Sequence, residues 1–166
     1  MAQVYVSIGS NIERRQHVGA ALRMLEQEFG ALVQSPVYES AAVGFESAPF
    51  YNLVVGFETG MEPRDVQERL HAIEDSNGRD RSAALAARTL DLDILLYDDR
   101  VMDRDGVLLP RDDITRYAFV LRPLAEIAGS RRHPVIGKRL DALWSEFADA
   151  SQVLQRVDWP PGEMPG

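Results

Sequence analysis

Two aspartates separated by a single residue are the sharpest chemical feature of the sequence. Asp91 and Asp93 lie in the segment TLDLDILLY at 89–97. Side chains two residues apart on a strand project to the same side, so the apolar neighbours of the two aspartates should face the core and the aspartates should share the opposite face. The bases of the two acidic side chains should then lie roughly 6–7 Å apart. Such a pair suits Mg²⁺, whose other ligands are often water and substrate phosphates. The alternative is an exposed strand face decorated with acids, although Asp is disfavoured in strands.

Three arginines precede this segment, within GRDRSAALAAR: Arg79, Arg81 and Arg88. Guanidinium groups beside two metal-binding carboxylates form the charge arrangement of polyphosphate transfer, since they neutralise oxygens that the metal does not reach. The small residues between them predict a loop that closes over substrate. The alternative is a solvated surface loop. The sequence contains no GxxxxGK[ST] motif, so a P-loop enzyme is excluded.

An amide and an aromatic ring occur together in the apolar segment FYNLVV. Asn52 is unfavourable inside a strand unless its amide is used, and Phe50 shares its face. The pair is suited to the edge and face of a flat heterocycle, although Phe50 also fits a simple core position. The three histidines, His17, His71 and His133, are scattered along the chain, so we expect packing or surface roles for them rather than a metal site.

Hydrophobic periodicity predicts the elements that must position these residues. Strands are expected at 3–8, 31–38, 50–58 and 89–97, with helices at 13–29 and from Pro63 to just before Asn77. This βαββαβ order is typical of ferredoxin-like folds. Residues 98–112 should form a turn or hairpin, and helices should follow at 117–128 and around 140–147.

The predicted fold class is therefore α+β: a ferredoxin-like βαββαβ sheet with helices on one face and additional C-terminal helices. We expect a single domain over 1–158 and a flexible tail over 159–166, where WPPGEMPG is poorly suited to ordered structure.

Composition bounds the classes of function. The 166 residues include 18 basic and 26 acidic side chains, for a net charge of −8, which argues against generic nucleic-acid binding. There is no cysteine, so disulfides and thiolate chemistry are excluded. No apolar run is long enough to span a membrane, and no secretory leader is evident. We expect a cytoplasmic protein that uses neither a membrane nor a nucleic acid.

With these residues assembled, the chain resembles the 6-hydroxymethyl-7,8-dihydropterin pyrophosphokinase family over about residues 3–130. VSIGSN is similar to the family's IGSN start, and FYNLVV to its YxN strand. RTLDLDILLYDD matches its highly specific RTLDLDIL signature, and LPRDDITRYAFVLRPLAEIA follows its last motif. The resemblance implies transfer of pyrophosphate from ATP to the hydroxymethyl oxygen of the dihydropterin, with release of AMP, in folate biosynthesis.

The resemblance also implies roles for individual residues. Asp91 and Asp93 would hold two Mg²⁺ ions and, with Arg81 and Arg88, form the catalytic set. Nucleotide-binding candidates are Arg79, Arg81, Arg88, His71, Glu74, Arg111 and Arg116. Pterin-binding candidates are Ser40, Ala41, Val43, Phe50, Asn52 and Phe119. The co-substrate would be ATP, and the protein would be a monomer or a weak dimer.

Three departures from the family pattern leave alternatives open. Leu85, Ala86 and Ala87 stand where the family commonly has Trp-Gly-Pro, so a main stacking partner of the pterin is missing. Arg111 replaces a His, and Tyr117 replaces an Arg, with Arg116 one place earlier. One alternative is a divergent paralogue that binds pterin or nucleotide with little or no catalysis. Another is an interaction domain without a ligand.

Overall fold

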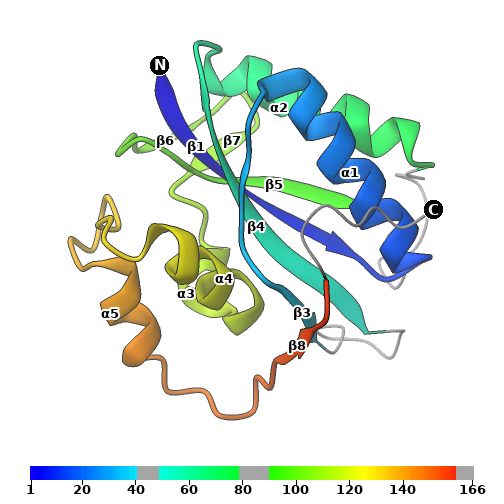
Figure 1. The fold of residues 1–166 in the computed structure, drawn as a ribbon. Coiled ribbons are helices and arrows are strands. Elements are labelled where there is room, and N and C mark those ends of the chain that lie inside the picture. Colours follow the sequence, from blue (N-terminus) through cyan, green and yellow to red (C-terminus); the bar gives the residue numbers. More distant parts are fainter. Residues whose placement is uncertain (41–48, 79–89, 160–166) are drawn as a thin grey trace.

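An antiparallel sheet forms the centre of the computed structural model, which describes residues 1–40, 49–78 and 90–159 (Figure 1). Its strands run in the order β5-β1-β4-β3-β8, and β2 pairs with β4 beside β3. Two further strands, β6 and β7, form a separate hairpin. The bounds are β1 Ala2–Ser10, β2 Val33–Gln34, β3 Val37–Ser40, β4 Phe50–Thr59, β5 Asp91–Tyr97, β6 Met102–Arg104, β7 Val107–Leu109 and β8 Gln155–Val157.

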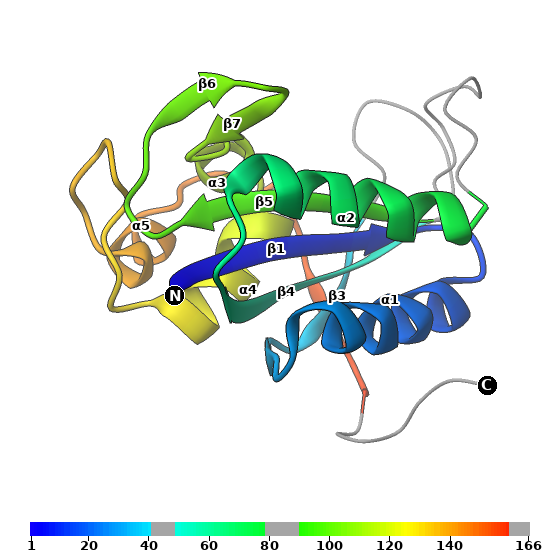
Figure 2. The same ribbon diagram turned by 90° about the horizontal axis from the view of Figure 1, so that it is seen from above.

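Five helices accompany the sheet in the described ranges. They are α1 Arg14–Phe29, α2 Pro63–Ser76, α3 Asp113–Arg116, α4 Ala118–Ala128 and α5 Leu140–Ser145. Pro63 starts α2, where its missing N–H costs no intrahelical bond. Viewed from above, α2 lies along β5, and the β6–β7 hairpin stands beyond the start of this helix (Figure 2). Within the described ranges, every helix is too short or too polar to span a bilayer.

The two faces of the sheet carry separate apolar cores. Leu53 and Val54 are adjacent on β4 and fully buried, yet Leu53 belongs to the cluster that includes Val18 and Leu70, whereas Val54 belongs to the cluster that includes Leu121. Because successive strand residues point to opposite faces, α1 and α2 cover one face, and α4 covers part of the other with α5 packed against α4. The two apolar cores therefore lie on opposite faces of the sheet.

Most predicted elements are present, and the mixed helix-and-antiparallel-sheet architecture is confirmed. The predicted strand 31–38 was wrong in its bounds, because the chain breaks at Ser35 and Pro36 into β2 and β3. There the Ser35 hydroxyl accepts a hydrogen bond from Val54 N at 2.9 Å, and Pro36 has no N–H to donate. The last helix ends at Ser145, before Phe147, and strand β8 was not predicted.

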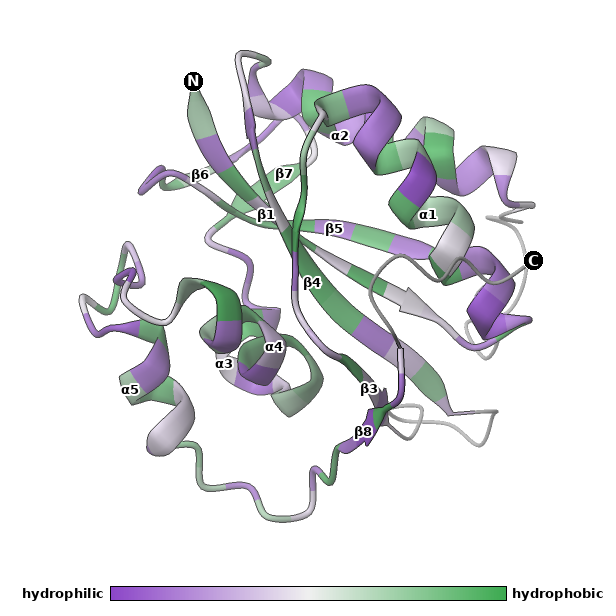
Figure 3. Ribbon diagram, in the orientation of Figure 1, coloured by the Kyte–Doolittle hydropathy of each residue, from purple (hydrophilic) through white to green (hydrophobic). Residues whose placement is uncertain are grey.

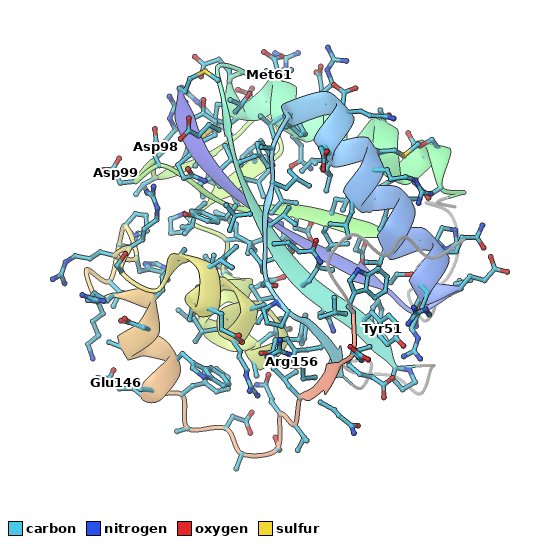
Figure 4. All side chains as sticks on the ribbon, viewed as in Figure 1. Tyr51, Met61, Asp98, Asp99, Glu146 and Arg156 are labelled. Atoms are coloured by element: carbon cyan, nitrogen blue, oxygen red, sulfur yellow. The ribbon has the colours of Figure 1, made fainter. Side chains whose placement is uncertain are left out.

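The end of the described chain packs against the sheet. Trp159, the first residue of the predicted tail, lies edge-on to Tyr51 with 6.4 Å between ring centroids, and the Arg15 guanidinium sits 5.3 Å from its indole centroid. Tyr51 is labelled on β4 in Figure 4. The rest of the predicted tail, 160–166, lies outside the described residues.

Candidate active site

Strand register gathers polar residues on the face of the sheet that α4 partly covers. Gly9 of β1 pairs with Asp91 of β5 on one side and with Asn52 of β4 on the other. Ser7, two residues back on β1, pairs with Asp93. Directly paired residues project to the same face, so Asp91, Gly9 and Asn52 form one row across three strands. With neighbouring strands about 4.8 Å apart, the two ends of that row are roughly 10 Å apart.

The aspartate pair has the alternation that the sequence predicted. Leu92 and Ile94 are 1% and 3% exposed, whereas Asp91 and Asp93 are half-buried. Figure 3 shows the resulting bands of hydrophilic and hydrophobic colour along β5. Between the two acids, the Leu92 N–H donates to Glu74 Oε2 at 2.8 Å. Glu74, a buried residue of α2, thereby fixes the backbone that carries both aspartates.

The charges around Asp93 are mainly negative. The pKa of its carboxyl is raised to about 6, mainly by burial; Arg111 lowers this pKa, whereas Asp91, Glu74 and Asp113 contribute to raising it. Arg111 Nη2 lies 3.4 Å from Asp93 Oδ1, and its Nε lies 3.3 Å from Asp113 Oδ2. One guanidinium therefore faces two carboxylates directly and does not offset the local excess of negative charge. A hard cation would be attracted to this position.

A bulge in β5 sets where Arg111 meets the sheet. Tyr5 pairs with Leu96 and Val6 with Ile94, so Leu95 is the extra residue. The backbone N–H of Arg111 donates to the Leu95 carbonyl at 3.1 Å. Bulges commonly redirect a strand beside functional sites. Here the carbonyl of the extra residue holds the backbone of Arg111 two residues along β5 from Asp93.

The other end of the site combines an amide, a hydroxyl and an aromatic ring. Asn52 and Ser40 are 5% and 8% exposed, and Asn52 Nδ2 donates to Ser40 Oγ at 2.6 Å. A Cβ built on Gly9 would lie 3.3 Å from Asn52 Oδ1 and 3.7 Å from the Phe50 ring. Glycine at position 9 therefore leaves the amide and ring uncrowded. Phe50 shares the face of Asn52, as predicted.

The first turn of α4 adds two more rings. Tyr117 and Phe119 are stacked, with centroids 4.9 Å apart and planes 18° apart. Helix α4 packs against β4 and, less extensively, against β3, the strands that carry Asn52 and Ser40. Tyr117 therefore places its ring against Phe119.

The other residues predicted to bind nucleotide or pterin are either exposed on helices or lie outside the described residues. His71 is exposed on α2 with its Nε2 2.8 Å from Gln67 Nε2, and Arg116 is exposed at the end of α3. The predicted nucleotide residues Arg79, Arg81 and Arg88 lie outside the described residues, as do the predicted pterin residues Ala41 and Val43. The interpretation of 79–88 as a loop that closes over substrate stays a prediction for the same reason.

Three residues of this region were not singled out from the sequence: Ser7, Gly9 and Asp113. Alternation along the first strand could have identified Ser7 and Gly9, because they alternate with the apolar residues Val4, Val6 and Ile8 and so project to the opposite face. Asp113 gave no such signal, since its place beside Arg111 depends on how the chain turns into α3.

The candidate metal ligands among the described residues are the carboxylates of Asp91 and Asp93. No group of three or more His, Asp or Glu side chains is arranged to hold an ion in the described ranges. Mg²⁺ is often held by one or two carboxylates together with water and phosphate oxygens. The hard oxygen donors of Asp91 and Asp93 fit that ion.

Comparisons with known proteins agree on one family. The family model described as 7,8-dihydro-6-hydroxymethylpterin-pyrophosphokinase (HPPK) matches residues 5–129. The protein named 2-amino-4-hydroxy-6-hydroxymethyldihydropteridine pyrophosphokinase of Pseudomonas aeruginosa is 39% identical over 136 residues, which is 80% of this chain and 84% of that protein. The Haemophilus influenzae protein of the same name is 32% identical over 157 residues, covering 92% of this chain and 98% of its own.

A solved structure extends the likeness to the fold. Plasmodium falciparum HPPK-DHPS, wild type with pteroate, superposes with a TM-score of 0.73 over 88% of this chain at 14% identity. The chain spans 42% of that longer chain. At this identity the likeness concerns the fold alone. On its motifs, its matched residues and its curated relatives, the chain belongs to the 7,8-dihydro-6-hydroxymethylpterin-pyrophosphokinase family.

Proposed function

We propose that this protein transfers the pyrophosphoryl group of ATP to 6-hydroxymethyl-7,8-dihydropterin in folate biosynthesis. The hydroxymethyl oxygen forms a bond to the β-phosphorus of ATP, the bond from that phosphorus to the oxygen bridging the α-phosphate breaks, and the hydroxyl proton is released. The products are AMP and the pterin diphosphate ester. Membership of the family supports this reaction.

One observation carries the proposal: a single face of the sheet bears the acid pair at one end and the amide–hydroxyl–aromatic group at the other. Asp91 and Asn52 flank Gly9 in register, roughly 10 Å apart. That separation allows a flat heterocycle at Asn52 to extend its hydroxymethyl group toward phosphates held near Asp91. Alignment of two bound substrates is the main requirement of phosphoryl transfer.

Asp91 and Asp93 are proposed to hold Mg²⁺, with two ions expected. When bound, the metal neutralises charge on the phosphates. The protein's own contribution is to keep the carboxylates at a fixed spacing on β5, with the Leu92 N–H between them held by Glu74. The resemblance adds Arg79, Arg81, Arg88, Arg111, Arg116 and His71 as proposed nucleotide contacts.

Asn52, Ser40 and Phe50 are proposed to bind the pterin, together with Phe119, Ala41 and Val43. The hydrogen bond from Asn52 Nδ2 to Ser40 Oγ fixes which side of the amide is already used, so Oδ1 is the atom available to accept from a pterin N–H. The proposed stacking partners are Phe50 and the ring of Phe119 at the start of α4.

The finer fold assignment is also a proposal. The strand order β5-β1-β4-β3, with α1 and α2 on one face, supports a ferredoxin-like arrangement extended at its edge by β8. We further propose one domain over 1–158, a cytoplasmic location and a monomeric or weakly dimeric state. Gel filtration with light scattering tests the last.

A binding-only paralogue gains no support from these observations. The departures at Arg111 and Tyr117 leave the aspartate pair and Asn52 in place, and the curated relatives reported above are named as pyrophosphokinases. The non-ligand interaction domain is likewise not supported.

AMP formation tests the proposal. The protein is incubated with ATP, Mg²⁺ and hydroxymethyl-dihydropterin, and AMP is quantified with and without the pterin. We expect pterin-dependent AMP that Asp91→Ala and Asp93→Ala reduce by at least about a thousandfold, as loss of charge stabilisation in the transition state does. The matched control is Asp99→Ala, an exposed residue just beyond the opposite end of β5 (Figure 4), which should keep wild-type turnover. Pterin-dependent AMP at the wild-type rate in either active-site variant would remove the metal assignment.

A further inference from the structure

The chain after α5 returns to the edge of the sheet as a long connection. We call residues 146–157 the C-terminal strap. It begins at Glu146, runs past the start of α4 and ends in β8, where Arg156 lies; both residues are labelled in Figure 4. Strand β8 pairs with β3, placing Arg156 opposite Tyr38 and Gln155 opposite Glu39. The strap therefore joins the C-terminal helices to the strand that carries Ser40.

One side chain of the strap makes three polar contacts. Gln152 Oε1 accepts from Ala118 N at 2.8 Å, and its Nε2 donates to the Arg116 carbonyl at 2.9 Å. The same Nε2 donates to Asp149 Oδ2 at 3.0 Å. Since a carboxylate only accepts hydrogen bonds, Asp149 fixes the nitrogen on its own side and leaves the oxygen to face Ala118.

These contacts cap a helix from a distant part of the chain. The first N–H groups of any helix lack intrahelical partners, and Tyr117, which precedes α4, supplies no side-chain cap. Gln152, 34 residues later, caps Ala118 instead. Its two backbone partners, Arg116 and Ala118, lie on either side of Tyr117. Both flanks of Tyr117 are thus held by one amide.

Apolar packing attaches the beginning of the strap, where Phe147 packs against the core cluster that includes Leu121 of α4. A pocket of about 370 Å³ separates the strap from the helices, lined in part by Thr115, Leu121, Leu143, Phe147 and Gln152. The hydrogen bonds of the strap to the backbone on both sides of Tyr117 come from Gln152.

We propose that Gln152 is a positioning residue for the pterin site, acting through the stacked pair Tyr117 and Phe119. It fixes the backbone on both sides of Tyr117, and Phe119 follows directly in the first turn of α4. This inference rests on the proposed function, in which Phe119 stacks on the pterin. Gln152 itself touches neither substrate.

The test separates pterin binding from chemistry and from folding. Gln152→Ala should raise the KM for hydroxymethyl-dihydropterin about tenfold, the effect of losing hydrogen bonds worth a little over 1 kcal/mol. The kcat at saturating pterin and the KM for ATP should stay within about twofold of wild type. Gln152→Glu keeps an acceptor for Ala118 but cannot donate to Arg116, and its charge faces Asp149, so its KM for the pterin should rise as well.

The matched control is Gln155→Ala, an exposed glutamine of β8 that should leave both KM values unchanged. Amide exchange at Ala118 gives a direct readout and should accelerate in both Gln152 variants but not in the control. A purely structural role would lower the active fraction, and hence the apparent kcat, with an unchanged pterin KM, and that result would overturn the inference. Wild-type protein that forms no pterin-dependent AMP would refute the proposed function instead.

Discussion

The two faces of the sheet use the same strands for different purposes. On the face under α1 and α2, Leu53, Leu92 and Ile94 form part of a continuous apolar core. On the other face, only the half under α4 is apolar, and the remainder carries Asp91, Asp93 and Asn52. Because neighbouring residues of one strand serve opposite faces, stability and site chemistry should respond separately to substitutions only one position apart.

The largest stability effect is expected on the apolar face. Leu53 is fully buried, and Leu53→Ala should lower the free energy of unfolding by about 3 kcal/mol, as leucine truncation in a core does. Urea unfolding measures the change. The KM for the pterin should remain within twofold below the unfolding transition.

Asn52→Ala, one residue away, is the matched contrast. It removes the hydrogen bond to Ser40 and should raise the pterin KM at least about tenfold, with a stability loss near 1 kcal/mol. If both variants changed KM and stability to the same extent, the separation between the faces would not hold.

Removal of the charge of Asp93 should have an intermediate effect, of opposite sign. The pKa of this carboxyl is about 6, above about 3.9 for an unfolded aspartate. The folded protein therefore holds the proton more readily, and its stability falls as pH rises through that window. Without metal, Asp93→Asn should be more stable than wild type by about 1–2 kcal/mol at pH 8, allowing for partial exposure.

That gain should disappear below about pH 3, where the wild-type carboxyl is protonated in both the folded and the unfolded state. Thermal unfolding in EDTA across the pH range measures it, with Asp99→Asn as the control on an exposed site. A variant that is less stable than wild type at pH 8 would show that Arg111 outweighs burial at this position.

The smallest effect is expected at Gly9. A Cβ there would lie 3.3 Å from Asn52 Oδ1, so Gly9→Ala should crowd the amide and raise the pterin KM about fivefold. Stability should change by less than about 1 kcal/mol, because Asn52 can shift by a few tenths of an ångström. Gly60→Ala, where the nearest atom is Met1 Sδ at 3.6 Å, is the control, and an equal KM in the two variants would contradict the role given to Gly9.

Sequence periodicity was sufficient to predict which side chains of the strands face the apolar core and which face the candidate site. The alternation in DLDIL predicted which residues of β5 face the core, and the parity of Phe50 and Asn52 was also correct. β8 escaped prediction because three residues are too few to show a period, and its pairing with β3 is a tertiary contact. The capping of Ala118 by Gln152 likewise depends on the return of the chain across 34 residues.

The site was predictable where local pattern and motif coincided, at Asp91, Asp93 and Asn52. The Arg111 contact with Asp93 was not, because it depends on the bulge at Leu95, which pattern alone does not reveal.

The Leu92–Glu74 hydrogen bond has a consequence for association between copies of the protein. Among the described strands, β5 is the last of its sheet, and an edge strand offers backbone groups to which another chain can add. Glu74 occupies one of those groups, and the acids on either side place like charges where a second β5 would align. Residues suited to phosphate chemistry therefore also discourage strand addition, and neutral substitutions at both aspartates should increase self-association at high concentration.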